Sequence, residues 1–280
     1  MKTRAIPLTP RTAASITLAS IVGVFAFGWP LIANSGSALV AHSGDGPWLM
    51  LALMPLVLAV VLADIADGGM DAKAVAILGV LIAVIAALRP LGGGVAGLEP
   101  VWAVVILGGR AFGPGFGFAL GSLGVFASAL TTGGVGPWLP FQMFAAAWVG
   151  VGAALLPPLR GRAEVGMLAG YGAVVGIAVG TLLNLWFWPF TTGLPSSVAY
   201  VGGAPLAELL HRLFAFSVLT SLGYDIPRAI LTATLLLIAA APLLRALRRV
   251  QRRAHFGAAP TFTTSEPAAE LAPAQATESV

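Results

Sequence analysis

Long apolar runs separated by short polar segments are the dominant pattern of this 280-residue chain. A helix that crosses a bilayer needs about 20 predominantly apolar residues, and backbone groups in hydrocarbon must find their partners inside the protein, so only helices and closed barrels span. The runs are continuous and do not alternate as barrel strands do. The pattern therefore predicts an all-α, polytopic membrane helix bundle. The predicted spans are 12–33, 47–63, 72–88, 99–109, 116–130, 139–156, 165–187 and 226–244.

Proline and glycine are expected to set several span boundaries. Proline cannot continue the backbone hydrogen bonds of a helix, so the third run is predicted to stop at Arg89 and Pro90. The run from 99 to 109 is too short, at about 1.5 Å per residue, to cross roughly 30 Å of hydrocarbon alone. We therefore expect neighbouring helices to shield it. The run 116–130 carries small residues that let helix backbones approach closely in lipid; they are Gly117, Gly121, Ser122 and Gly124.

The segment 206–222 is predicted to lie in the membrane interface, with Glu208, His211 and Arg212 along it. Its competing interpretation is a further span. A further span would place the five arginines that follow the last apolar run on the outside, against the tendency of Lys and Arg to stay on the cytoplasmic side. The charge pattern thus favours the interfacial helix.

The distribution of positive charge predicts the orientation. With the N-terminus inside, 12 of the 15 Lys and Arg fall on the cytoplasmic side, and only Arg89, Arg212 and Arg228 fall outside. The sequence thus predicts a multi-pass protein of the cell membrane with both termini cytoplasmic. The residues on the cytoplasmic side are Lys2, Arg4, Arg11, Lys73, Arg110, Arg160, Arg162, Arg245, Arg248, Arg249, Arg252 and Arg253.

The first apolar run is predicted to be a retained membrane anchor, and the last residues of the chain a disordered tail. The first run invites comparison with a signal peptide cleaved near Ala38, but it exceeds the roughly 7 to 15 residues of a signal h-region and more spans follow. A retained anchor is the favoured interpretation. Residues 255–280 are rich in Ala, Pro, Thr and Glu, a composition that cannot bury a core, so they are predicted to form a disordered cytoplasmic tail.

Composition excludes several classes of function. The chain is 58% hydrophobic and 9% charged, outside the range of soluble domains, which makes the lipid bilayer its main environment. Its net charge of +4 sits at span ends instead of on a solvated basic domain, so no nucleic-acid partner is expected. Cysteine is absent and the three histidines are scattered, which excludes disulfides and thiolate chemistry and predicts no metal or cofactor site.

An enzyme is the main alternative to a binding protein. Asp64, Asp67 and Asp71 resemble the aspartate motifs by which membrane prenyl transferases hold magnesium and diphosphate. No second acidic motif accompanies them, and charged clusters of this kind usually form solvated loops. Neither Gly-x-Ser-x-Gly nor a phosphate-binding P-loop occurs. We therefore predict no enzyme, with an integral membrane enzyme of lipid or isoprenoid metabolism as the alternative.

Candidate ligand-binding residues gather in three segments that the topology places on the outer face. They are the glycine-rich loop after Arg89, the loop 131–140 and the aromatic edge 184–190. Small ligands are held in apolar pockets with a few polar groups and a vitamin-sized molecule can stack on aromatic rings, although tryptophan belts occur at every membrane interface. The candidate substrate-binding residues are Glu99, Trp138, Phe141, Gln142, Asn184, Trp186 and Trp188.

The third run also carries a stripe of small residues, three or four positions apart. Such stripes mediate close helix contacts, and the partner is either this protein's own bundle or a separate subunit. The stripe consists of Ala72, Ala76, Gly79, Ala83 and Ala87.

Residues 72–249 resemble a substrate-specific S component of an energy-coupling factor (ECF) type ABC transporter, of the actinobacterial type. The resemblance rests on a Gly-Pro helix start paired with a Gly-Pro-Trp loop, and two shorter motifs add to it. The paired motifs are GRAFGPGFGF at 109–118 and GGVGPWLPFQM at 133–143, and the shorter ones are NLWFWP at 184–189 and TSLGYD at 220–225.

The resemblance implies a six-helix membrane domain at 72–254, here preceded by two additional N-terminal transmembrane helices within 1–71. Such a subunit binds a vitamin or related micronutrient from outside and docks on a T component driven by two ATPase subunits. Docking would use the stripe at Ala72, Ala76, Gly79 and Ala83. The ligand loops would be 91–99, 131–138 and 189–204, and relatives with this pattern resemble cobalamin or corrinoid transporters.

Overall fold

The computed structural model describes residues 8–33, 70–92 and 97–254. Within these ranges the chain is helical apart from its connections, and no strand occurs, which confirms the all-α prediction. The predicted span at 47–63, Asp64, Asp67 and the predicted tail at 255–280 lie outside the described residues.

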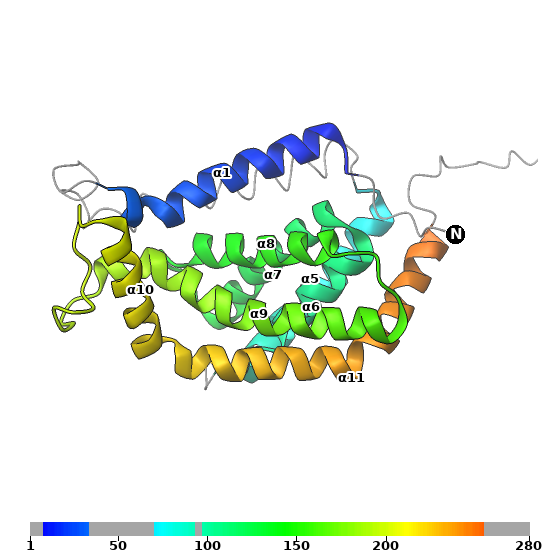
Figure 1. Ribbon diagram of the computed structural model, residues 1–280. Coiled ribbons are helices and arrows are strands. Elements are labelled where there is room, and N and C mark those ends of the chain that lie inside the picture. The colour runs from blue at the N-terminus through cyan, green and yellow to red at the C-terminus, as the bar shows by residue number, and fades with distance from the viewer. Residues whose placement is uncertain (1–7, 34–69, 93–96, 255–280) are drawn as a thin grey trace, which may run out of the picture.

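The helices form an antiparallel bundle whose members run back and forth along one long axis (Figure 1). The elements are α1 (Pro10–Ile32), α5 (Ala72–Gly92), α6 (Val101–Phe112), α7 (Pro114–Thr132), α8 (Leu139–Leu155), α9 (Gly161–Phe187), the 3₁₀ turn η2 (Trp188–Phe190), α10 (Leu206–Thr220) and α11 (Leu222–Ala254).

Five described helices, α1, α5, α7, α9 and α11, are long and apolar enough to cross a membrane. They correspond to five of the predicted spans. The predicted span 139–156 is the 17-residue helix α8, and the short run after Glu99 is the 12-residue helix α6. Ten of the residues of α6 are buried, so the expectation that neighbouring helices shield this piece is confirmed.

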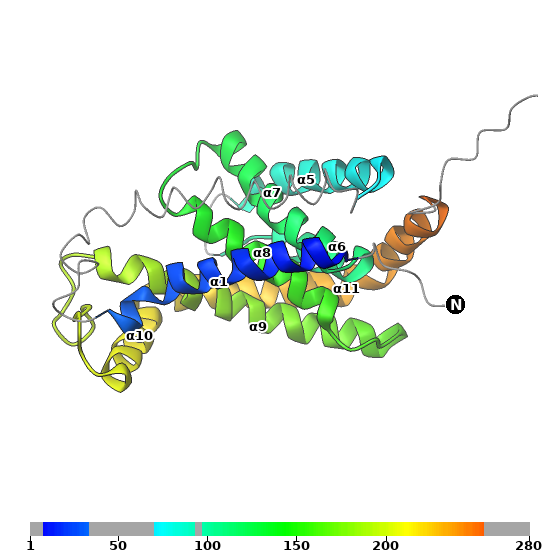
Figure 2. The same cartoon turned by 90° about the horizontal axis from the view of Figure 1, so that it is seen from above.

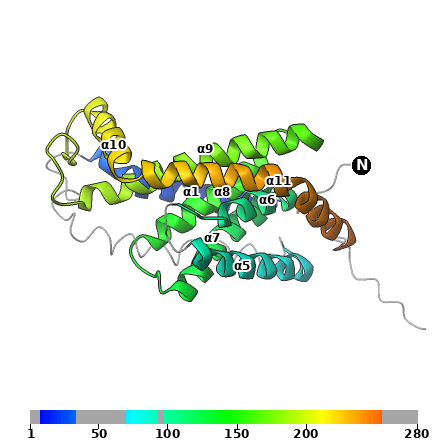
Figure 3. The same ribbon diagram turned by 90° about the horizontal axis from the view of Figure 1, so that it is seen from below.

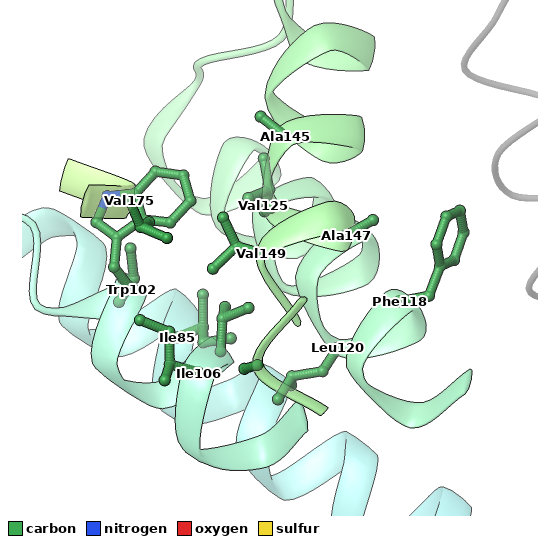
Figure 4. Packing of buried hydrophobic residues seen from close by; sticks show 14 of the residues in the cluster. Ile85, Trp102, Ile106, Phe118, Leu120, Val125, Ala145, Ala147, Val149 and Val175 are labelled. Carbon is green, nitrogen blue, oxygen red and sulfur yellow. The ribbon is translucent and has the colours of Figure 1, made fainter. Parts of the chain in front are cut away.

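The core fills the space between α5, α6, α7, α8 and α9. Figure 4 shows one side chain from each of these helices among the packed residues, namely Ile85, Ile106, Val125, Val149 and Val175. Lipid tails are as apolar as these side chains, so helix association in a bilayer depends on close packing more than on exclusion of water. The fit of this core therefore determines how the helix ends are positioned.

Glycines bring α7 and α8 into backbone contact. A Cβ atom on Gly117 would collide with the backbone of Gly150, and one on Gly121 would collide with the backbone of Ala146. The contacting residues are four positions apart on each helix: Gly117 and Gly121 on α7, and Ala146 and Gly150 on α8. Small residues at this spacing let two helices approach closely in a membrane. The predicted role of Gly117 and Gly121 is confirmed.

Two predicted helix boundaries were wrong. Helix α5 continues through Pro90 to Gly92, so Pro90 removes one backbone hydrogen bond without ending the helix. Helix α11 begins at Leu222 instead of 226 and extends to Ala254, with Pro227 in its early turns and Pro242 in its interior. The helix changes direction in its C-terminal part (Figure 3), as an interior proline favours.

Helix α10 lies across the end of the bundle instead of along its axis, as Figures 1 and 2 both show. Its buried residues Leu209, Leu213 and Phe216 pack on Trp188. Its opposite side exposes apolar side chains at intervals of four, among them Leu206 and Phe214. This geometry suits a helix in the membrane interface, and its placement there remains a prediction.

Helix α1 packs on the outside of the same bundle. The indole Nε1 of Trp148 in α8 donates a hydrogen bond to Ser20 Oγ at 3.0 Å, and the hydroxyl of Tyr200 donates to the carbonyl oxygen of Pro30 at 3.0 Å. The first helix is therefore joined to the domain predicted at 72–254 along its length, from the middle of α8 to the loop before α10.

The backbone contact between α7 and α8 predicts that alanine destabilises the protein at a glycine inside the contact and not at a glycine outside it. Gly150→Ala should lower the free energy of unfolding by about 1–3 kcal/mol or more, because the added methyl group cannot be accommodated against Gly117. Gly170→Ala is the matched control, since nothing lies within 4 Å of its Cβ position and alanine favours a helix by about 1 kcal/mol. Thermal unfolding in detergent measures both, and equal midpoints would contradict the packing.

Candidate functional site

A network of charged and polar side chains joins the helix ends near α10. Its centre is Arg228 in α11, which is buried with 9% of its surface exposed. The guanidinium donates from Nε to Glu99 Oε2 at 2.8 Å and from Nη1 to Asp225 Oδ1 at 2.6 Å. Nη1 also donates to the carbonyl oxygen of Gly176 in α9 at 3.2 Å. One arginine thus connects α11, α9 and the segment before α6.

Hydrogen bonds extend the network toward α10. Ser221 Oγ donates to the second oxygen of Asp225, Oδ2, at 2.8 Å. The amide nitrogen of Asn184 in α9 donates to Ser221 Oγ at 2.9 Å and to Ser217 Oγ at 3.1 Å. Asn184 therefore ties the end of α9 to α10 and to the first turn of α11.

On its other side the network reaches α5, α6 and α8. The indole Nε1 of Trp102 donates to Glu99 Oε2 at 2.8 Å, and Arg89 donates from Nη2 to Gln142 Oε1 at 3.0 Å. The end of α5 lies against the segment that carries Glu99, because a Cβ atom on Gly92 would collide with the carbonyl oxygen of Leu98. Six helices thus contribute to one polar region.

The charges of this region balance. Arg89 and Arg228 carry two positive charges, and Glu99 and Asp225 carry two negative ones. Ionisable residues at membrane depth are rare, are almost always paired and usually mark functional sites. Balanced pairing explains how the bundle accommodates four such groups.

Two glycines make room for the network. Gly97 has φ of 71°, a left-handed conformation that favours glycine, and a Cβ atom there would collide with the backbone of Tyr224. A Cβ atom on Gly180 in α9 would collide with the carboxylate of Asp225. These positions let the segment before α6 and the face of α9 approach the start of α11.

Phe141 and Trp186, two of the predicted aromatic site residues, stack on each other. In the sequence Phe141 precedes Gln142, and Trp186 follows Asn184 by two positions. The rings of Phe141 and Trp186 are parallel within 8° with centroids 4.6 Å apart, and Phe27 of α1 meets Phe141 edge-on at 4.9 Å. Both stacked side chains are buried. They order the ends of α8 and α9 from which Gln142 and Asn184 project.

The other two predicted aromatic residues lie in separate loops. Trp188 is fully buried, donates from Nε1 to the carbonyl oxygen of Val198 at 2.8 Å and packs on Tyr200, so it anchors the loop before α10. Trp138 is 42% exposed and donates to the carbonyl oxygen of Gly134 in its own turn at 3.0 Å. The structure thus brings together Glu99, Gln142 and Asn184 from the predicted set.

Sequence reasoning missed six members of the network. A signal was present for two of them, because Arg89 and Arg228 are among the three basic residues predicted to lie on the outer side. An arginine on the side of the membrane that is otherwise poor in Lys and Arg often has a polar or acidic partner inside the protein. Arg228 has Glu99 and Asp225, and Arg89 has Gln142. The missed residues are Arg89, Trp102, Ser217, Ser221, Asp225 and Arg228.

A second charged cluster closes the opposite end of the bundle. Arg110 of α6 and Arg248 of α11 both donate to Glu164 Oε1 in α9, at 2.7 and 2.6 Å. Arg110 also donates to the carbonyl oxygens of Leu156 and Pro157 at 2.8 Å each, which satisfies groups that the end of α8 leaves open. The cluster therefore joins α6, α9 and α11 at this end of the bundle.

The small-residue stripe on α5 faces away from the core. Ala72, Ala76, Gly79 and Ala83 are exposed, and nothing lies within 4 Å of the Cβ position of Gly79. Helix α5 instead buries Ala74, Leu78 and Ile85. Within the described part of the chain, the stripe therefore packs on no helix of its own bundle.

The acidic cluster considered for an enzyme is described only at Asp71. Its Oδ1 accepts a hydrogen bond from the backbone N–H of Ala74 at 2.8 Å, so Asp71 caps the start of α5. In the described ranges, no three His, Asp or Glu side chains come together as a metal site would require.

Fold and composition together define a polytopic helical membrane protein with a balanced charged network at one end of its bundle. Comparison of the chain with protein-family models, with curated proteins and with solved structures finds no match.

The central position of Arg228 predicts a large effect of its removal. Arg228→Gln leaves Glu99 and Asp225 without their shared partner and should lower the free energy of unfolding by about 3–5 kcal/mol. Arg245→Gln is the control, because Arg245 is exposed and donates only to Ala241 of its own helix. Unfolding in detergent at neutral pH measures the difference, and a loss no greater than that of the control would show that the network is dispensable.

Proposed function

We propose that this protein is the substrate-binding membrane subunit of an energy-coupling factor importer. It captures a vitamin or related micronutrient from outside the cell, with a cobalamin or corrinoid as the first ligand to test. The observation that carries the proposal is the charged network near α10, to which the predicted site residues Glu99 and Asn184 belong.

The contacts of the three predicted ligand segments support capture at this end. Arg89 at the end of α5 binds Gln142 after the loop that precedes α8, and Glu99 binds Arg228. Asn184, at the start of the third segment, donates to Ser217 of α10 and to Ser221 just before α11. Each of these side chains is hydrogen-bonded to a residue of another helix. A ligand that contacts one of them therefore contacts a group that links two helices.

The proposal assigns ATP hydrolysis to other subunits and docking to α5. No phosphate-binding P-loop occurs in the sequence, so ATP hydrolysis is assigned to two separate ATPase subunits. The exposed small residues of α5 offer a surface on which a helix of a T component can pack closely. The stripe and the charged network lie on different parts of the molecule, so docking and capture can proceed without competition.

Binding by the purified protein tests the proposal. In detergent or nanodiscs, cyanocobalamin should bind saturably with one site per chain, measured by isothermal titration calorimetry. Asn184→Ala should weaken this binding by about tenfold, since it removes two hydrogen bonds that order the site. Uptake of the vitamin by cells that proceeds unchanged without any ATPase subunit would contradict the proposal.

Docking is tested separately on α5. Gly79→Leu and Ala83→Leu place bulky side chains on the exposed stripe and should abolish co-purification with the T component and ATPases while leaving ligand binding intact. Gly170→Leu, on the exposed side of α9, is the matched control. Retention of the complex by both stripe variants would exclude this face of α5 as the docking surface.

A further inference from the structure

The C-terminal part of α11 is longer than a membrane span requires. At about 1.5 Å per residue the 33-residue helix is about 50 Å long, whereas the hydrocarbon core of a bilayer is roughly 30 Å thick. The residues between Arg228 and Arg245 are uncharged, and five arginines then follow within nine positions. In a bilayer these last turns therefore reach the depth of the lipid headgroups, where α11 bends away from the bundle axis (Figures 1 and 3).

One side of this segment packs on the bundle. Leu244 and Gln251 are buried, and Leu247 packs against the main core. Arg248 donates two hydrogen bonds to Glu164 of α9, at 2.9 and 2.6 Å. Residues three and four positions apart share a face of a helix, so these contacts fix one face on the protein and leave the others pointing away from it.

The outward surface of the segment divides into a charged side and an apolar side. Arg245, Arg249 and Arg252 are exposed and follow one another at intervals of four and three, which places them on one stripe. Leu243 and Val250 are also exposed, and at 3.6 residues per turn they lie on a different side of the helix. A helix at the edge of a bilayer is divided in this way, with apolar side chains toward the acyl chains and arginines toward the headgroups.

The positive charge of this stripe is not offset by the protein. Glu164, the carboxylate in contact with this part of α11, is already shared between Arg110 and Arg248. In the part of the chain that the structure describes, no hydrogen bond or ion pair joins Arg249 or Arg252 to another residue. Like charges three or four positions apart on a helix repel one another, and an anion bound along the stripe relieves this repulsion.

We propose that the arginine face of α11, formed by Arg245, Arg249 and Arg252, binds the headgroup of an anionic phospholipid. A guanidinium matches the oxygens of a phosphate with paired hydrogen bonds. The depth of the segment and its apolar side favour a lipid over a soluble anion, because acyl chains can contact Leu243 and Val250. The uncompensated charge favours an anionic headgroup over a zwitterionic one. This interaction is independent of what the protein captures at its other end.

Native mass spectrometry of the delipidated full-length protein in detergent tests the preference. Phosphatidylglycerol and phosphatidylcholine with the same acyl chains are titrated separately, and the number and affinity of bound lipids are compared. Phosphatidylglycerol should bind at least tenfold more tightly, since its charge is complementary to that of the arginine face. Equal affinity for the two lipids would overturn the proposal.

A pair of double variants locates the binding on α11. Arg249→Gln combined with Arg252→Gln should weaken phosphatidylglycerol binding about tenfold to thirtyfold, whereas Arg249→Lys combined with Arg252→Lys keeps the charge and should lose less. Both side chains are exposed, so the unfolding midpoint without lipid should not change. Arg160→Gln combined with Arg162→Gln is the matched control, because it removes the same charge from exposed positions around the start of α9 and should retain the affinity.

Two results would contradict the assignment. Equal loss of phosphatidylglycerol binding in the two glutamine double variants would show that the lipid responds to total charge and not to the arginine face. Unchanged phosphatidylglycerol binding in the Arg249 and Arg252 variant, with loss of co-purifying ATPase subunits, would assign the face to an acidic partner protein instead of a lipid.

Discussion

The contact on which this structure depends is the one between Arg228 and its two carboxylates. A guanidinium and two acids placed singly in an apolar bundle would each lose several kcal/mol of hydration, whereas together they satisfy one another at 2.6 and 2.8 Å. The arrangement requires α9, α11 and the segment before α6 to meet within hydrogen-bonding distance. Gly97 and Gly180 permit this approach, because any side chain at either position would occupy the same space.

The two ends of the bundle use charge in different ways. At the end opposite α10, Glu164 is enclosed by Arg110 and Arg248, and Arg110 also satisfies two carbonyl oxygens at the end of α8. Near α10 the network joins Glu99, Asp225 and Arg228 to the polar side chains of Asn184 and Ser221.

Much of the fold follows from local features of the sequence. Continuous apolar runs predicted the helices, a short run between Glu99 and Gly109 predicted a shielded helix, and Gly117 and Gly121 predicted a close contact between helix backbones, which the structure places between α7 and α8. These features depend on neighbours in sequence or on residue size, which are visible without a structure. The prediction at Pro90 was wrong because a helix can lose the one backbone hydrogen bond that proline removes and still continue, as α11 also does at Pro227 and Pro242.

The site was only partly predictable, since its contacts join distant segments. Glu99 and Arg228 are separated by 129 positions, and no periodicity or motif links them. Glu99, Gln142 and Asn184 were found as polar residues at the edges of apolar runs, which is a local property. The hydrogen-bond partners of these three residues could not be predicted, because they come from distant segments. Trp188, predicted as a ligand contact, is buried in the loop before α10, where it packs on Tyr200 and Phe216.

An experimental structure of the protein in a lipid nanodisc with its bound ligand tests the central claim most directly. The account predicts density for the ligand at the end of the bundle near α10, in contact with side chains of the charged network around Arg228. Density at the Glu164 end, or in contact with none of these side chains, would contradict it.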